Sequence, residues 1–288
     1  MPHGFRVFLE TNNYKEKTIA SHTKEIENFF SYLDSRSNIT KELFQISSQD
    51  LKNYLENQSK QLSASTVYKK LGILKLFFDF LWKTDQVPVD QCMKIQLPRA
   101  NREYEINLTH DMLYNIQEQV FNSSKYPNRC KLAFVFALYG FKSSELYFNK
   151  EDFEMVGDDE VIITTPKRTV YITGIPALIL IEYYNTQSLF ADTQYFLFSK
   201  STEDGMIVYN KISYVNLNRY LNSIAIDFNL PELNLGKARQ SYIYHLAYRD
   251  KLSFKEISKV LGISMEWLGE MFGKTKDSTY PKDSNSTA

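Results

Sequence analysis

The sequence predicts a mainly α-helical protein of two domains, in which the second domain carries one small antiparallel sheet. Apolar residues recur at helical spacing along most of the 288-residue chain. Residues 151–173 depart from that spacing and contain runs of β-branched residues, which are typical of strands. Residues 84–103 contain two prolines and little periodicity, and they separate the two helical parts.

The first domain is predicted to be a helical bundle over residues 1–97. Residues 17–35 place Ile19, Ile26 and Phe29 on one side of an amphipathic helix. Ser47 and Asp50 have the spacing of a capping box before a second helix. Residues 63–83 form the clearest helix, with a continuous apolar stripe. A linker is placed at residues 98–103.

The second domain is predicted to span residues 104–273. Two β-branched runs, 161–163 and 169–172, read as a strand pair joined by a tight turn at Pro166-Lys167-Arg168. Helices are expected at residues 109–122, 127–140, 143–148, 176–186, 210–228, 238–249, 253–261 and 264–272. The polar segment 274–288 is expected to be a disordered tail.

Composition excludes several classes of protein. Hydrophobic residues make up 43% and charged residues 24% of the chain, with a formal net charge of zero. Cys92 and Cys130 do not make a disulfide framework. No apolar run approaches the roughly 18 residues that span a bilayer, and the first residues lack a signal pattern. We therefore expect a cytoplasmic protein without membrane association. No zinc or Gly-rich phosphate motif occurs, so no metal and no cofactor are predicted.

Four short motifs occur along the second domain. Tyr139–Leu146 (YGFKSSEL) is similar to T-G-x-R-x-S-E-L, and Arg239–Tyr242 (RQSY) is similar to R-H-T-F. Leu252–Gly262 is similar to a segment that ends in I-x-x-x-L-G, and Thr165–Lys167 fits a hairpin that carries a lysine. With this order and spacing, the sequence resembles the tyrosine recombinase (phage integrase) family, in its Xer-like form. The resemblance implies an N-terminal SAM-like helical core-binding domain and a tyrosine-recombinase-type catalytic-domain fold.

The resemblance also implies a specific chemistry, which this sequence does not fully support. In the family a tyrosine attacks phosphorus, two arginines and a histidine or tryptophan surround the phosphate, and a lysine protonates the leaving group. Phe272 stands at the tyrosine position and has no oxygen, so the resemblance implies a degenerate, non-catalytic member. The positions that correspond to catalytic residues are Lys142, Lys167, Gly236, Arg239, Ile263 and Phe272.

Double-stranded DNA is the partner that the resemblance implies. The helix face with Lys69, Lys70 and Lys75 is either a solvated surface or a phosphate contact. Arg239 either binds a phosphate or pairs with an internal carboxylate, and Lys167 with Arg168 either reach phosphates or serve the turn. The candidate DNA-binding residues are Lys69, Lys70, Lys75, Arg99, Lys142, Lys167, Arg168, Lys237 and Arg239.

Other residues receive plainer interpretations. Glu145 is expected to be a structural hydrogen-bonding partner, and His245 is expected to have no special chemistry. The apolar stripe of Trp267, Leu268, Met271 and Phe272 either packs within the chain or joins two protomers.

The favoured hypothesis is a sequence-specific DNA-binding protein without recombinase activity, a regulator such as a repressor encoded by a phage or mobile element. The alternatives are an active recombinase that uses a displaced nucleophile such as Tyr280, and an accessory protein of an active recombinase.

Overall fold

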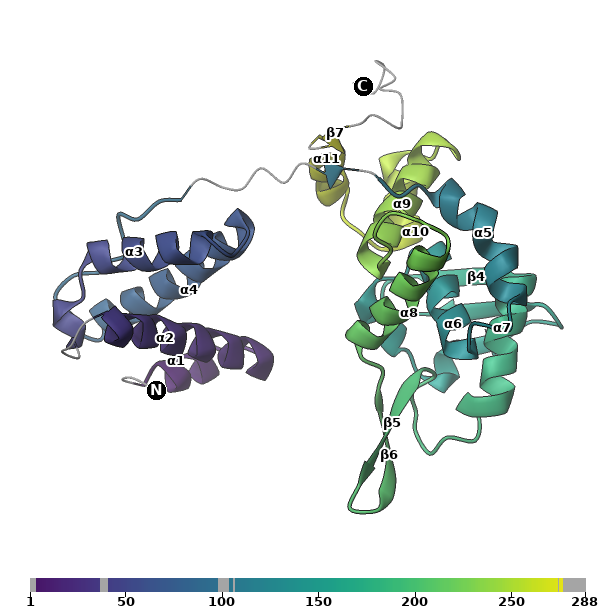
Figure 1. Ribbon diagram of the computed structural model, residues 1–288, viewed down its shortest axis with the longest axis horizontal. Helices are drawn as coiled ribbons and strands as arrows, with labels where there is room; N and C mark the ends of the chain where they lie inside the picture. The colour runs from purple at the N-terminus through teal and green to yellow at the C-terminus, as the bar shows by residue number, and fades with distance from the viewer. Residues whose placement is uncertain (1–3, 37–40, 98–103, 106, 274, 277–288) are drawn as a thin grey trace. The chain divides into compact units, whose positions relative to one another are not determined.

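The computed structural model divides into two compact units, one up to residue 102 and one from residue 103 (Figure 1). It describes residues 4–36, 41–97, 104–105, 107–273 and 275–276. Both units are mainly helical, the strands among the described residues lie in the second unit, and the predicted fold class is confirmed. No helix in this described part of the chain has the length and hydropathy needed to cross a membrane.

The first unit is a helical bundle around an aromatic core. Phe29, Phe77 and Phe78 are fully buried, and the ring of Phe29 meets that of Tyr54 edge-on at 5.3 Å between centroids. The predicted capping box is present, because Ser47 N donates to Asp50 Oδ2 at 2.9 Å. The helices are α1 (Phe5–Thr11), α2 (Glu16–Arg36), η1 (Leu43–Gln45), α3 (Ser48–Ser59) and α4 (Ala64–Lys83).

The second unit surrounds a larger core in which α6 is buried on nearly every side. Its helices are α5 (His110–Asn122), α6 (Asn128–Leu138), η2 (Ser143–Tyr147), η3 (Lys150–Asp152), α7 (Ile175–Tyr183), η4 (Tyr184–Ser188), α8 (Tyr214–Asp227), α9 (Leu235–Tyr248), α10 (Phe254–Leu261) and α11 (Met265–Gly273). Its strands are β1 (Tyr104–Glu105), β2 (Phe153–Met155), β3 (Glu160–Thr164), β4 (Thr169–Thr173), β5 (Phe198–Glu203), β6 (Met206–Lys211) and β7 (Thr275–Lys276).

The predicted strand pair is the centre of an antiparallel sheet of order β2-β3-β4. Val161 pairs with Ile172 and Ile163 pairs with Val170, and all four side chains are buried on one face. This alternation of buried and exposed residues is the one expected for a strand with one wet face. The turn is closed by Thr165, whose hydroxyl donates to Arg168 O at 2.8 Å.

Two expectations for the second half of the chain need correction. The helix expected at 210–228 begins only at Tyr214, because residues up to 211 belong to a β5–β6 hairpin that projects from the unit (Figure 1). Asp204 and Gly205 turn this hairpin with φ of 49° and 80°, a conformation that favours a tight two-residue connection. Residues 275–276 of the expected tail form β7, which pairs in parallel with β1.

Candidate functional site

The loop after α6 places Lys142 and Glu145 side by side. The chain turns at Gly140, which has a φ of +59°. Only glycine fits here without strain, because a Cβ would overlap the Tyr242 ring. Lys142 N then donates to Glu145 Oε2 at 2.6 Å as η2 begins. Glu145 is buried while the Lys142 side chain is exposed. The two residues therefore point to different surroundings although they are three positions apart.

Two buried arginines converge on the Glu145 carboxylate. Arg168 Nε donates to Oε1 at 3.2 Å, and Arg239 Nη1 donates to Oε2 at 2.9 Å. Arg239 also donates to Gly140 O at 2.6 Å and to Leu261 O at 3.0 Å. Burial lowers the pKa of both guanidinium groups, and the nearby Glu145 charge opposes that shift. Glu145 is thus a structural partner of the kind expected from the sequence.

Arg168 lies in the interior of the second unit. Its side chain is 2% exposed, lies 4.8 Å above the Phe141 ring and donates to Tyr139 O and Gly140 O. Its Nε and Nη2 donors are directed to the interior, so Arg168 serves the turn and the cluster around Glu145, the second of its two predicted roles. Arg239 shares the same cluster and pairs with an internal carboxylate, one of its two predicted roles.

A cavity of about 530 Å³ opens beside this cluster. It brings together five of the six positions that the sequence assigned to catalysis, from four separate parts of the second unit. The apolar side chains of Ile263, Trp267 and Met271 form much of its wall. The lining residues are Lys142, Glu145, Lys167, Gly236, Arg239, Gln240, Ile243, Gly262, Ile263, Ser264, Trp267 and Met271.

Phe272 is the sixth position, and it is not part of the cavity lining. Its ring packs 4.7 Å from that of Tyr244 and 4.9 Å from that of Phe254. Leu268 and Met271 are also buried within the chain, and of the predicted apolar stripe only Trp267 is well exposed. The stripe therefore serves mainly packing inside the unit.

The hairpin turn that carries Lys167 rests directly on the end of α10. Gly262 caps that helix with φ +58°, and a Cβ on it would lie 2.6 Å from Lys167 O. This contact constrains the position of the turn, and therefore of Lys167, which lines the cavity.

Gly262→Ala should lower the free energy of unfolding by about 1 to 3 kcal/mol, because it adds backbone strain and a clash with a main-chain oxygen. Urea unfolding measures this loss. Gly269→Ala is the matched control, since nothing lies within 4 Å of a Cβ on that exposed helical glycine. If both variants unfold at the same urea concentration, the Gly262 contact does not constrain the turn.

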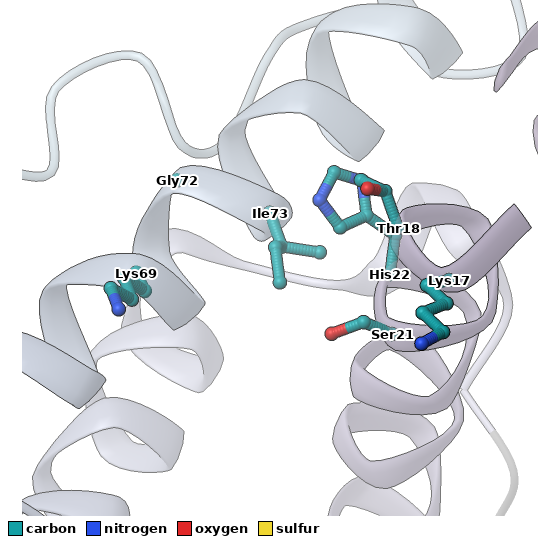
Figure 2. A pocket seen from close by; sticks show the side chains of 7 residues that line it. All are labelled: Lys17, Thr18, Ser21, His22, Lys69, Gly72 and Ile73. Carbon is teal, nitrogen blue, oxygen red and sulfur yellow. The ribbon is translucent and has the colours of Figure 1, made fainter. Parts of the chain in front are cut away.

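The first unit has a groove of about 460 Å³ between α2 and α4, with a lysine from each helix. Figure 2 shows Lys17 and Lys69 on either side of Ser21 and Ile73. Lys69 is exposed, as a phosphate contact requires. Sequence reasoning missed Lys17 and Ser21, although their i, i+4 spacing places them on one helix face.

The other candidate cations have different surroundings. Lys70 forms a largely buried ion pair with Glu25, which also accepts a hydrogen bond from Tyr54, so its ammonium group already has a partner within the unit. Lys75 is half-buried, and Lys237 pairs with Glu232 at 3.1 Å near the surface. Arg99 and Tyr280 lie outside the described residues.

A histidine pair joins α5 to α9, which the sequence did not suggest. The rings of His110 and His245 are 4.6 Å apart, and His245 Nδ1 lies 3.4 Å from Asp111 Oδ1. Burial, together with the neighbouring His245, lowers the pKa of His110 to about 4. Over the residues described, no cluster of His, Cys, Asp or Glu could hold a metal ion.

Comparisons with known proteins agree with this architecture. Residues 5–84 match the family described as "Phage integrase, N-terminal SAM-like domain". The fold is similar to a lambda integrase dimer bound to a COC' core site, with a TM-score of 0.67, 14% identity, and 96% of this chain and 95% of that chain covered. It is also similar to XerH site-specific recombinase bound to difH substrate, with a TM-score of 0.66, 18% identity and coverage of 93% and 81%. The class is that of the two-domain tyrosine recombinase fold.

One curated relative is also similar to the chain in sequence. The chain is 25% identical over 187 residues to tyrosine recombinase XerC of Roseiflexus sp. (strain RS-1). The aligned part covers 62% of this chain and 58% of that relative, less than two thirds of its length. The N-terminal match, this sequence similarity and the fold together show that the chain is similar to tyrosine recombinases over both units.

Proposed function

We propose that this protein binds a specific double-stranded DNA site through both units and does not cut it. One observation carries the proposal: cations line the cavity at positions that correspond to the family's phosphate-binding residues, and no tyrosine lines it. Lys142, Lys167 and Arg239 line it, while Phe272 lies outside the lining and packs against Tyr244. Cations without a nucleophile can hold a phosphate but cannot form a covalent bond to it.

The loss extends beyond the tyrosine position. Gly236 and Ile263 stand where the family's histidine and its histidine or tryptophan are expected, and neither side chain can donate a hydrogen bond. Lys142 keeps a positive charge in place of an arginine but lacks the planar fork that grips two phosphate oxygens. Stabilisation of the developing charge on phosphorus would therefore be weak even with a nucleophile present.

A protein that occupies a DNA site without cutting it is suited to regulation of transcription. We propose that it acts as a repressor of a phage or other mobile element, since a protein that binds a specific DNA site as an integrase does would cover a promoter that overlaps the site. Lys17 and Lys69 of the first unit and Lys142 and Lys167 of the second are the proposed phosphate contacts. Self-association through Leu268, Met271 and Phe272 is not part of the proposal, because these side chains pack within the chain.

The test is selection of bound fragments from genomic DNA, followed by gel retardation of the recovered site. We expect specific binding that falls steeply with salt, because phosphate contacts release counterions. The double variant Lys142→Gln/Lys167→Gln should weaken binding and reduce the slope of log affinity against log salt by about one per lost contact. The double variant Lys200→Gln/Lys211→Gln, at two exposed lysines of the β5–β6 hairpin, is the control of equal charge change. Binding to all fragments alike would contradict the proposal.

A working recombinase is the second candidate, because the relative and the solved structures that the chain is similar to are recombinases. A nicked suicide substrate built on the recovered site separates the two. We expect no covalent protein–DNA adduct from the native chain, and none from Phe272→Tyr, whose ring would stay packed against Tyr244 and Phe254. An adduct formed by the native chain and lost in Tyr280→Phe would establish the recombinase instead.

A further inference from the structure

The wall of the cavity in the second unit is more apolar than contact with a DNA phosphate requires. Ile243, Ile263, Trp267 and Met271 line it, although a phosphodiester has only charged and polar oxygens to offer. Trp267 is 40% exposed, so a large aromatic surface is left open to solvent beside the cavity. An exposed apolar surface of this kind in a concave site is a mark of ligand binding.

The lining of the cavity also carries unbalanced positive charge. Glu145 is the sole carboxylate among the lining residues, and it is already shared by the guanidinium groups of Arg168 and Arg239. Lys142 and Lys167 are exposed at the rim, and none of the ion pairs found among the described residues includes either of them. The two ammonium groups are therefore available to an anion.

The dimensions agree with a small molecule. The volume of about 530 Å³ falls in the range of roughly 300 to 1,000 Å³ that is usual for ligand pockets. A pocket with an apolar wall and a few convergent polar groups binds the body of a ligand through the wall and orients it through the polar groups. Here the wall suits an aromatic ring, and the two lysines suit a phosphate or carboxylate.

We propose that this cavity binds a small organic anion with an aromatic body, and that the ligand releases DNA by competing with the DNA backbone for Lys142 and Lys167. The regulatory half of this inference rests on the proposed function, since it needs a bound DNA site. The binding half does not, because it depends only on the cavity. The ligand's ring packs against Ile263 and Trp267 while its charged group meets the lysines.

Binding can be measured on the whole chain through Trp267. The chain has two tryptophans, so Trp82→Phe leaves Trp267 as the only indole fluorophore. Phenyl phosphate is the probe, and inorganic phosphate is the probe without a ring. We expect a saturable change in fluorescence, with phenyl phosphate binding at least tenfold tighter than inorganic phosphate. Equal affinities for the two, or no saturable change, would overturn the inference.

Variants then show which residues bind the charged group of the ligand and which bind its ring. Lys142→Gln/Lys167→Gln should weaken phenyl phosphate at least tenfold, and Ile263→Thr should weaken it several-fold while leaving inorganic phosphate unchanged. Lys200→Gln/Lys211→Gln should leave both affinities unchanged. Circular dichroism confirms that each variant is folded. Unchanged affinity for phenyl phosphate in both cavity variants would overturn the assignment to this cavity.

The regulatory half is tested on the recovered DNA site at constant ionic strength. We expect saturating phenyl phosphate to raise the protein concentration for half-retardation at least fivefold, and inorganic phosphate at the same concentration to have no such effect. Tight phenyl phosphate binding without any release of DNA would overturn the regulatory half alone. Absence of a specific DNA site would overturn the proposed function and leave the fluorescence result standing.

Discussion

Glu145→Gln should lower the free energy of unfolding of the second unit by about 3 to 5 kcal/mol. Glu145 is the common partner of Arg168 and Arg239, and all three side chains are buried. Glutamine keeps the shape but removes the charge, so two guanidinium groups would remain in the interior without a counter-charge. Urea unfolding followed by Trp267 fluorescence in a Trp82→Phe background reports on this unit, since Trp267 lies on α11.

Glu232→Gln is the matched control for that substitution. It removes a carboxylate of the same unit whose ion pair with Lys237 is largely exposed to solvent. Exposed pairs of this kind contribute at most about 1 kcal/mol. A midpoint for Glu145→Gln as close to the native value as that of Glu232→Gln would show that the buried arginines are neutralised in another way.

The second unit should lose about 3 kcal/mol of stability as the pH falls from 6.5 to 4, because of His110. Burial lowers the pKa of His110 to about 4, against 6.5 in an unfolded chain. As the pH falls, the unfolded chain therefore takes up this proton first and becomes favoured. His110 therefore does not reduce the free energy of unfolding well above pH 6.5. The reduction grows as the pH falls from 6.5 toward the folded-state pKa of about 4. Tyr242 packs against His110, Asp111 and Asp250 lie beside His245, and Arg249 pairs with Asp111.

His110→Phe isolates this effect, because it keeps a ring against Tyr242 and His245 and cannot take up a proton. Other titrating groups are shared by both proteins, so they cancel in the difference between the two curves. The measurement is the free energy of unfolding at several pH values between 4 and 7. Parallel curves for the native chain and His110→Phe would mean that His110 is already protonated or exposed in the folded state.

Most of the helices and the central sheet could be predicted from the sequence because their signals are local. Apolar spacing marked α4, and β-branched runs on either side of Pro166 marked β3 and β4. The β5–β6 hairpin was missed for the same reason. Met206–Tyr209 is an apolar run that also fits the start of a helix, and periodicity alone cannot separate the two.

The candidate site was predicted in part. The motif spacing correctly brought Lys142, Lys167, Gly236, Arg239 and Ile263 to one cavity. Whether a cation faces that cavity or the interior could not be read from spacing, because its partner is remote. Arg168 pairs with Glu145, 23 residues away in the sequence, and Lys70 pairs with Glu25, 45 residues away. Locally, both cations look like ordinary surface charges.

The packing of Phe272 has a consequence for a tyrosine placed at this position. Met271 and Phe272 are neighbours on α11, and successive residues of an α-helix are turned by about 100° around its axis. Met271 lines the cavity, so the side chain at 272 leaves the helix in another direction, toward Tyr244 and Phe254. A hydroxyl introduced there by Phe272→Tyr would therefore point away from the cavity. It could reach the cavity only if α11 rotated about its axis or shifted along it, against the contacts that now hold it.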